Sequence, residues 1–170
     1  MGALYGVAQG SHHEPYVVVL EYNNSDNKDE KPIALAGKGV CFDTGGISLK
    51  PANRMWEMIH DMHGSASVVS AVYALAKNKV KKNVIGIVGL VENMPGGNAQ
   101  RPGDVVTSRS GQTVQMLNSD AEGRLVLIDI IDYVQEKYLP AKIINLATLT
   151  GAVVIACLLY TSDAADDPWS

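Results

Sequence analysis

Three apolar runs along the chain have the length and composition of β-strands. They are residues 16–22 (YVVVLEY), 33–42 (IALAGKGVCF) and 83–92 (NVIGIVGLVE). Each run is rich in aliphatic residues, and turn-forming residues separate them. The run at 33–42 is apolar at almost every position, which is typical of a strand buried on both faces of a sheet. A fourth strand is predicted at 142–148 (KIINLAT).

Two stretches between these strands have the residue spacing of α-helices. Residues 65–77 contain small side chains that would let a helix pack closely on a sheet, namely Ala66, Ser67, Ser70 and Ala71. From NSDAEGR (118–124) to about Lys137, an apolar stripe recurs at helical spacing, made of Leu127, Ile130, Ile131 and Val134. Short strands are expected near Val105 and Thr113. Alternating strands and helices predict an α/β domain with a mixed, largely parallel sheet flanked by helices on both faces.

The segment NSDAEGR has two interpretations, because it places two carboxylates and a guanidinium at the start of a predicted helix. In the first, Ser119 and Glu122 form a capping box, in which the hydroxyl accepts a backbone N–H and the glutamate reaches back. In the second, Asp120, Glu122 and Arg124 belong to a catalytic site. These seven residues alone favour the cap, so the rest of the chain must decide.

Composition excludes several classes of protein. The chain has 170 residues, which suits one domain, and its 46% hydrophobic and 19% charged residues are ordinary for a globular protein. The net charge of −4 and the short basic run KNKVKKN argue against nucleic-acid binding. No apolar run reaches the roughly 20 residues that span a bilayer, and no signal peptide is recognised. Two cysteines make no disulfide framework, so a cytoplasmic location is expected.

Most of the charged residues of interest follow a predicted strand or precede a predicted helix. They are Lys38, Asp43, Lys50, Asp61, Asp120, Glu122 and Arg124. In open α/β sheets ligands bind at the carboxyl ends of strands, so these residues could converge although they are distant in sequence. Clustered carboxylates would repel one another unless cations intervened. A pair of divalent metal ions would resolve that conflict and could activate a water molecule.

Each of these residues also has a local explanation. Asp43 could be a turn residue before a glycine pair, and Asp61 could cap the helix that follows it. Lys38 and Lys50 could be solvated surface charges. The four histidines invite a zinc interpretation, but they lack the His-Glu-x-x-His spacing that puts two ligands on one helical face. The Asp-Thr-Gly within FDTGG resembles the active-site turn of aspartic proteases, a chemistry that needs two such aspartates, and the chain holds one copy.

Several motifs together resemble the leucine (cytosol) aminopeptidase family. NSDAEGRL is close to the Asn-Thr-Asp-Ala-Glu-Gly-Arg-Leu signature of that family. GKGVCFDTGGISLKP, DMHGSASV, ENMPGGNAQRPGDV and ATLTGA also resemble the catalytic domain of the family in order and spacing, over residues 1–156. The resemblance implies a zinc-peptidase-like three-layer sandwich, here incomplete because the chains of the family are much longer.

The resemblance implies a two-metal aminopeptidase that releases leucine and other N-terminal residues from peptides. One metal ion would be bound by Lys38, Asp43, Asp61 and Glu122, and the other by Asp43, Asp120 and Glu122. Manganese or zinc is the expected metal. Lys50 would stabilise the tetrahedral oxyanion, and Arg124 would hold a bicarbonate ion that acts as general base. The substrate site would be lined by Met58, Asn118, Thr148 and Gly151.

The family resemblance also implies a homohexamer that acts on peptides with a free N-terminus. Residues 157–170 (CLLYTSDAADDPWS) are abruptly acidic and continue no helical or strand period. Residues 157–166 resemble a translated sequencing adapter. We therefore expect a partial aminopeptidase catalytic domain at 1–156, followed by a non-family tail that arises from read-through. The alternative function is that of a non-catalytic, metal-binding α/β fragment that keeps the ligands but lacks activity.

Overall fold

A four-stranded mixed sheet forms the centre of the protein. The computed structural model describes residues 1–154, and its sheet has the strand order β1-β3-β2-β6. The four strands are β1 (Tyr16–Asn23), β2 (Ile33–Asp43), β3 (Asn83–Asn93) and β6 (Lys142–Leu146). β3, β2 and β6 run parallel, whereas β1 pairs with β3 in the antiparallel direction. The prediction of a mixed, largely parallel sheet is confirmed.

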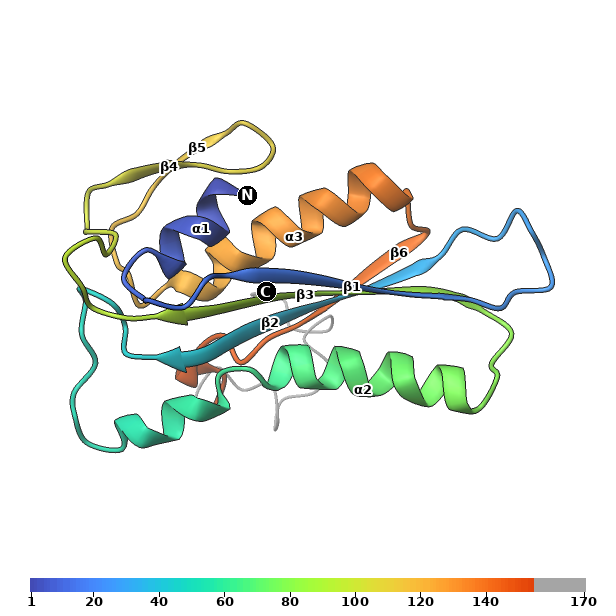
Figure 1. Cartoon of the computed structure of the whole chain (residues 1–170), viewed down its shortest axis with the longest axis horizontal. Helices are drawn as coiled ribbons and strands as arrows, with labels where there is room; N and C mark the ends of the chain where they lie inside the picture. Colours follow the sequence, from blue (N-terminus) through green and yellow to red (C-terminus); the bar gives the residue numbers. More distant parts are fainter. Residues whose placement is uncertain (155–170) are drawn as a thin grey trace, which may run out of the picture.

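Helices cover both faces of this sheet and make three layers (Figure 1). The helices α1 (Gly2–Ala8) and α3 (Glu122–Tyr138) pack together on one face, and α2 (His63–Lys77) packs on the other. The 3₁₀-helix η1 (Met55–His60) precedes α2, and it contacts β2. Sequence periodicity predicted α2 and α3 but neither α1 nor η1, which are too short for their periodicity to be distinguished.

The remaining elements lie outside the main sheet. β4 (Val105–Thr107) and β5 (Thr113–Gln115) lie where the sequence predicted short strands, and they form a separate antiparallel pair. The 3₁₀-helix η2 (Gly151–Val154) ends the described part of the chain. The tail predicted at 157–170 lies outside the described residues. Within residues 1–154, no helix combines the length and the apolar character that crossing a membrane requires.

The hydrophobic core lies between the sheet and the α1–α3 layer. It includes Val40, Ile87, Val126, Ile130 and Val134, each fully buried. β2 and β3 are the central strands and are buried along most of their length, as their continuous apolar sequence predicts. The apolar stripe predicted on α3 faces this core, so that prediction is confirmed.

The close packing of α2 on the sheet uses other residues than the sequence predicted. Its buried residues are Gly64, Ser65, Val68 and Val72, whereas Ser67 and Ser70 are exposed. A Cβ atom on Gly64 would lie only 2.1 Å from the carbonyl oxygen of Leu146, so only glycine allows the start of α2 to approach β6 this closely. The prediction that the small serines face the sheet is wrong, because α2 turns a different side inward.

A β-bulge near the end of β2 controls the direction of its last side chain. Cys41 has no partner in β3, so the five-residue step from Lys38 to Asp43 is matched by the four-residue step from Gly89 to Asn93. Side chains of a strand alternate between the two faces of a sheet. Five regular steps would put Lys38 and Asp43 on opposite faces, and the extra residue puts them on the same face.

Candidate metal centre

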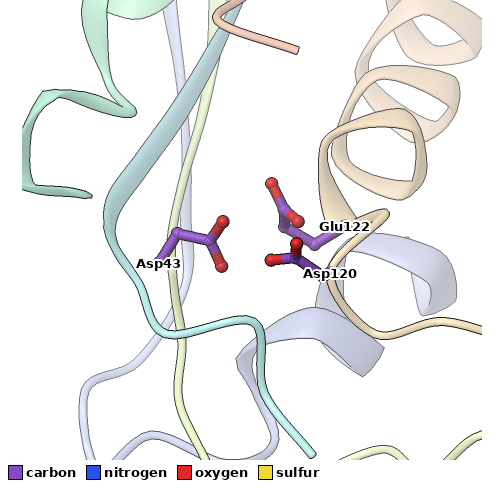
Figure 2. Close-up of side chains that lie close together, drawn as sticks. All are labelled: Asp43, Asp120 and Glu122. Carbon is purple, nitrogen blue, oxygen red and sulfur yellow. The ribbon is translucent and has the colours of Figure 1, made fainter. Parts of the chain in front are cut away.

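Carboxylates from two separate segments face one another at the carboxyl end of the parallel strands. Asp43 is the last residue of β2, and Asp120 and Glu122 lie just before and at the start of α3. Figure 2 shows the three side chains pointing into a common gap. One oxygen atom from each lies within 4.8 Å of the others, which is a spacing that could hold a metal ion. The sequence-based prediction that these loops converge is borne out in the geometry of these three residues.

Lys38 occupies the buried side of the cluster. Its side chain is 2% exposed, and its Nζ lies 2.8 Å from Asp61 Oδ1 and 2.7 Å from Glu122 Oε1. The same ammonium donates to the carbonyl oxygen of Thr148 at 2.8 Å. All three N–H groups of the ammonium are thus used. The interpretation of Lys38 as a solvated charge is wrong, because the β2 backbone carries it into the interior.

Lys50 occupies the open side of the cluster. Its Nζ lies 2.9 Å from Asp43 Oδ2 and also pairs with Asp120 Oδ1. Burial acts to lower the pKa of Lys50, but hydrogen bonds and charge attraction from Asp120 and Asp43 outweigh it and leave the pKa above its ordinary value. Lys50 therefore carries a positive charge at every physiological pH. The alternative of a surface lysine without partners is wrong.

Two of the carboxyl groups have pKa values above their ordinary values. Burial, followed by the negative charge of Asp43, raises the pKa of Glu122 to about 7 from an ordinary 4.5. Burial also raises the pKa of Asp61, although Lys38 and Thr148 act in the opposite direction. Ionisation of Glu122 therefore lowers the folding stability as the pH rises from the pKa of Glu122 in the unfolded chain to its pKa of about 7 in the folded chain.

The chemistry of the cluster fits divalent metal ions. Asp61 Oδ2 and Glu122 Oε2 are both buried, and neither has a hydrogen-bond partner within residues 1–154. Buried polar atoms are rarely left without a partner, and carboxylate oxygens are hard ligands for divalent cations. Positive charge placed beside these two oxygens would satisfy them and would offset the burial and the charge of Asp43 that raise the pKa of Glu122.

Metal binding is expected to strengthen with pH. A divalent ion must displace the proton that Glu122 holds below about pH 7, so binding releases a proton in that range. At the site formed by Asp43, Asp120 and Glu122, which does not include Lys38, we expect the Kd for Mn²⁺ to fall about tenfold per pH unit from pH 5.5 to 7, with a weaker dependence above pH 7. Isothermal titration calorimetry across this range measures the effect. An affinity that does not change with pH would contradict it.

The structure rejects the capping box proposed for Ser119 and Glu122. The N-cap residue of α3 is Ala121, and no side chain caps this helix. Ser119 Oγ instead donates to the carbonyl oxygen of Gly45 at 2.6 Å and accepts the N–H of Ser48 at 2.7 Å. Asp61 does not cap α2 either, since that helix also begins without a side-chain cap. Both segments serve the cluster rather than the helix ends.

A cleft of about 790 Å³ opens above the cluster. Its lining contains the five candidate ligands and Lys50, together with Met58, Thr148 and Gly151. Thr148 is also fixed to the cluster, because its Oγ1 donates to Asp61 Oδ1 at 2.7 Å. Asn118 and Arg124 are exposed and do not line this cleft, although Asn118 Oδ1 accepts the N–H of Asp120 at 2.9 Å.

The histidines lie away from the cluster. His12 and His13 line a separate cavity of about 440 Å³, next to Glu92 and the loop at 94–98. His60 and His63 are exposed and contact each other, with their ring centroids 5.3 Å apart. None of the four lines the cleft above the cluster, which agrees with the absence of a zinc-ligand spacing in the sequence.

Sequence reasoning missed Asn93, which is buried beside the cluster. Its Nδ2 donates to Asp43 Oδ1 at 2.8 Å and to the carbonyl oxygen of Ser119 at 2.9 Å. Asp43 Oδ1 also accepts the N–H of Gly45, so the predicted turn role of Asp43 is present alongside its place in the cluster. A polar residue that ends an apolar strand was the available signal for Asn93.

Fold and site together define an α/β domain with a candidate metal centre at the carboxyl end of its parallel strands. A sequence profile described as the cytosol aminopeptidase family, catalytic domain, matches residues 1–164. The chain belongs to the cytosol aminopeptidase family, which confirms the resemblance seen in the motifs. This family membership agrees with the α/β fold.

Curated relatives are similar over most of the chain. The chain is 62% identical over 156 residues to a protein of Rickettsia felis, and 61% identical over 160 residues to one of Brucella melitensis. Both relatives carry the name "Probable cytosol aminopeptidase". The alignments cover 92% and 94% of this chain but 31% and 33% of the relatives. The chain thus spans about a third of the length of these proteins.

Solved structures share the fold. The leucine aminopeptidase of Caenorhabditis elegans matches with a TM-score of 0.85 and 37% identity, over 92% of this chain and 32% of that one. A bottromycin maturation enzyme matches with a TM-score of 0.81 and 39% identity, over 91% of this chain and 32% of that one. These matches confirm the predicted fold class.

Proposed function

We propose that this chain carries the metal-binding part of an aminopeptidase that releases leucine and other N-terminal residues from peptides. The observation that carries the proposal is the cluster of Asp43, Asp120 and Glu122, which faces a cleft with room for a substrate. The membership of the chain in the cytosol aminopeptidase family supports the same activity. Hydrolysis by a metal-activated water needs carboxylate ligands of this kind next to an open position.

Two divalent metal ions are the proposed cofactors. Lys38, Asp43, Asp61 and Glu122 would hold one ion, and Asp43, Asp120 and Glu122 would hold the other. When bound, such a pair polarises a carbonyl group and makes a water molecule nucleophilic at neutral pH. Lys38 would have to bind as a neutral amine, because an ammonium group has no lone pair to offer a metal ion. Manganese or zinc remains the proposed identity, since carboxylate-rich sites accept several metals.

The residues of the chain would divide the other tasks of the reaction. Lys50 is charged and reaches the open side of the cluster, so it can stabilise negative charge that develops on the carbonyl oxygen of the substrate. The free α-amino group of a peptide would coordinate a metal ion held by these residues, which would explain a preference for N-terminal residues. Met58, Thr148 and Gly151 line the cleft and would contact the substrate.

Two proposed roles depend on side chains that lie outside the cleft lining. Arg124 is exposed at the start of α3, where its guanidinium could bind bicarbonate as the proposed general base. Asn118 would reach the substrate from the turn before Asp120. The homohexamer remains a prediction that rests on the family resemblance, and the cytoplasmic location remains a prediction that rests on the cysteine content.

Hydrolysis of leucine p-nitroanilide by the purified 170-residue chain with added Mn²⁺ tests the proposal. We expect metal-dependent release of p-nitroaniline, which Asp120→Asn and Glu122→Gln each reduce by about 100-fold or more, since each removes a charged ligand. Glu136→Gln is the matched control, because Glu136 lies on the exposed side of α3 and pairs with Arg109. That variant should keep full activity.

The assay also separates the proposal from the alternative of a non-catalytic fragment. Mn²⁺ binding without hydrolysis would favour the non-catalytic fragment, and the absence of both would overturn the metal centre itself. The exposed apolar side chains of Ile144 in β6 and Leu149 after it give the alternative a physical basis. An incompletely covered sheet edge of this kind would bind a hydrophobic dye.

A further inference from the structure

Asn93 lies where the two carboxylate-bearing segments of the cluster meet. It is the last residue of β3, is 4% exposed, and pairs with Asp43 in the parallel register of β2 and β3. Its Nδ2 bonds both Asp43 Oδ1 and the carbonyl oxygen of Ser119. One amide group therefore joins the end of β2 to the segment that carries Asp120 and Glu122.

The partners of Asn93 determine which end of its amide faces the cluster. Asp43 Oδ1 and the Ser119 carbonyl oxygen are both acceptors, so only the NH₂ group can satisfy them, with one hydrogen to each. The oxygen end of the amide lies next to Gly46, where an added Cβ atom would come within 2.8 Å of it. Gly46 has a φ of +67°, so a glycine lets this turn approach Asn93.

These contacts restrict the carboxylate of Asp43. Its Oδ1 accepts two N–H groups, from Gly45 at 2.9 Å and from Asn93 at 2.8 Å. Its Oδ2 accepts neither of them and pairs with Lys50 on the open side of the cluster. Because one oxygen is held by two donors, the carboxylate cannot rotate freely, and Oδ2 stays directed toward the cleft.

We infer that Asn93 is a positioning residue of the metal centre. It would act through Asp43, by fixing the carboxylate orientation, and through Ser119, by setting the distance between Asp43 and the Asp120–Glu122 segment. Hydrogen-bond partners behind a ligand orient it, and their loss weakens metal binding. This inference rests on the metal centre under the proposed function, and it assigns Asn93 no direct contact with an ion or a substrate.

The test compares two asparagines of the same strand by isothermal titration with Mn²⁺. Asn93→Leu removes both donors at similar side-chain volume, and we expect the Kd for Mn²⁺ to rise by about 10- to 100-fold. Asn83→Leu is the matched control. Asn83 begins β3 at the opposite end, where its side chain also makes two hydrogen bonds, with the N–H of Ser25 and the carbonyl oxygen of Glu30. Its loss should leave the Mn²⁺ affinity unchanged.

The outcomes separate the inference from the proposed function. If the unsubstituted chain fails to bind Mn²⁺, the metal centre is wrong; if it binds and Asn93→Leu binds equally well, the positioning role is wrong. Should Asn93→Leu fail to fold, nuclear magnetic resonance of the unsubstituted chain gives the answer. On titration with Zn²⁺, the side-chain amide signals of Asn93 should shift while those of Asn83 stay in place. The inference would be overturned if the Asn93 signals did not shift, or if they shifted no more than those of Asn83.

Discussion

Replacing Lys38 by methionine is expected to lower the free energy of unfolding by about 3–5 kcal/mol at pH 8, because it leaves buried carboxylates without their counter-charge. The Lys38 side chain is 2% exposed and contacts both Asp61 and Glu122 within 2.8 Å. Methionine fills a similar volume, so the loss reports the missing charge rather than a cavity. Urea unfolding of the metal-free chain, followed by circular dichroism, measures it.

The same substitution should cost less at pH 5. Burial raises the pKa of Glu122 to about 7, so this carboxyl is protonated at pH 5 in the folded state; burial also raises the pKa of Asp61. Without Lys38, both carboxyls would hold their protons to still higher pH. A group with a raised pKa loses folding stability as the pH rises through that value. Equal losses at pH 5 and pH 8 would therefore contradict the electrostatic explanation.

An exposed lysine provides the matched control for Lys38. Lys81 forms an ion pair with Asp26 at 2.8 Å, and its side chain is 61% exposed. Lys81→Met should change the free energy of unfolding by less than about 1 kcal/mol, because solvent screens a surface pair. If Lys38→Met were no more destabilising than Lys81→Met, the buried ion pairs would contribute nothing beyond a surface contact.

Replacing Asp129 by alanine is expected to cost about 3 kcal/mol or more of folding stability, because two buried backbone N–H groups and one part-buried N–H group would lose a charged acceptor. Asp129 lies in α3 and is completely buried. Its Oδ2 accepts the N–H groups of Ala3 and Leu4 at 3.0 and 3.1 Å, and its Oδ1 accepts the N–H of Arg109 at 2.7 Å. This carboxylate thus attaches α1 and the β4–β5 connection to α3.

Hydrogen exchange locates the effect of the Asp129 substitution. Amide protons of α1 should exchange much faster in Asp129→Ala, while those of β2 and β3 change less, because Asp129 anchors the start of α1 to α3 and accepts no hydrogen bond from the two central strands. Asp129→Asn should be milder, since the amide oxygen can still accept from Ala3 and Leu4. Asp132→Ala is the control, because Asp132 is partly exposed and pairs with Arg109 at the surface. Uniform exchange changes across the chain would argue against a local anchor.

Periodicity was a reliable guide for the long elements of the fold. β1, β2, β3, α2 and α3 lie within a few residues of their predicted bounds, because long apolar runs mark the strands and turn-forming residues separate the elements. The short helices α1 and η1 were missed, since neither spans enough turns to show a period. α1 is stabilised by Asp129, a contact across 126 residues that no local pattern reveals.

The residue types of the site were also readable, and the family motifs indicated which of them belong together. Local patterns misled at Ser119, where a capping-box spacing serves instead to hold the glycine turn at Gly45. They were silent at Asn93, because a single asparagine after a strand has many ordinary explanations. Hydrogen bonds between segments decided both cases.

The sequence by itself therefore determined the α/β class, the order of the long strands and helices along the chain, and which charged residues were candidates for the site. The tertiary structure decided which of those residues meet. Cys41 has no partner residue in β3, and this bulge places Asp43 on the same face as Lys38. Parallel pairing of β2 and β3 brings Asn93 beside Asp43. Strand register and the packing of α3 depend on contacts between segments that are distant in the sequence. No short stretch of sequence contains both partners of such a contact, so its energy cannot be read from a local pattern.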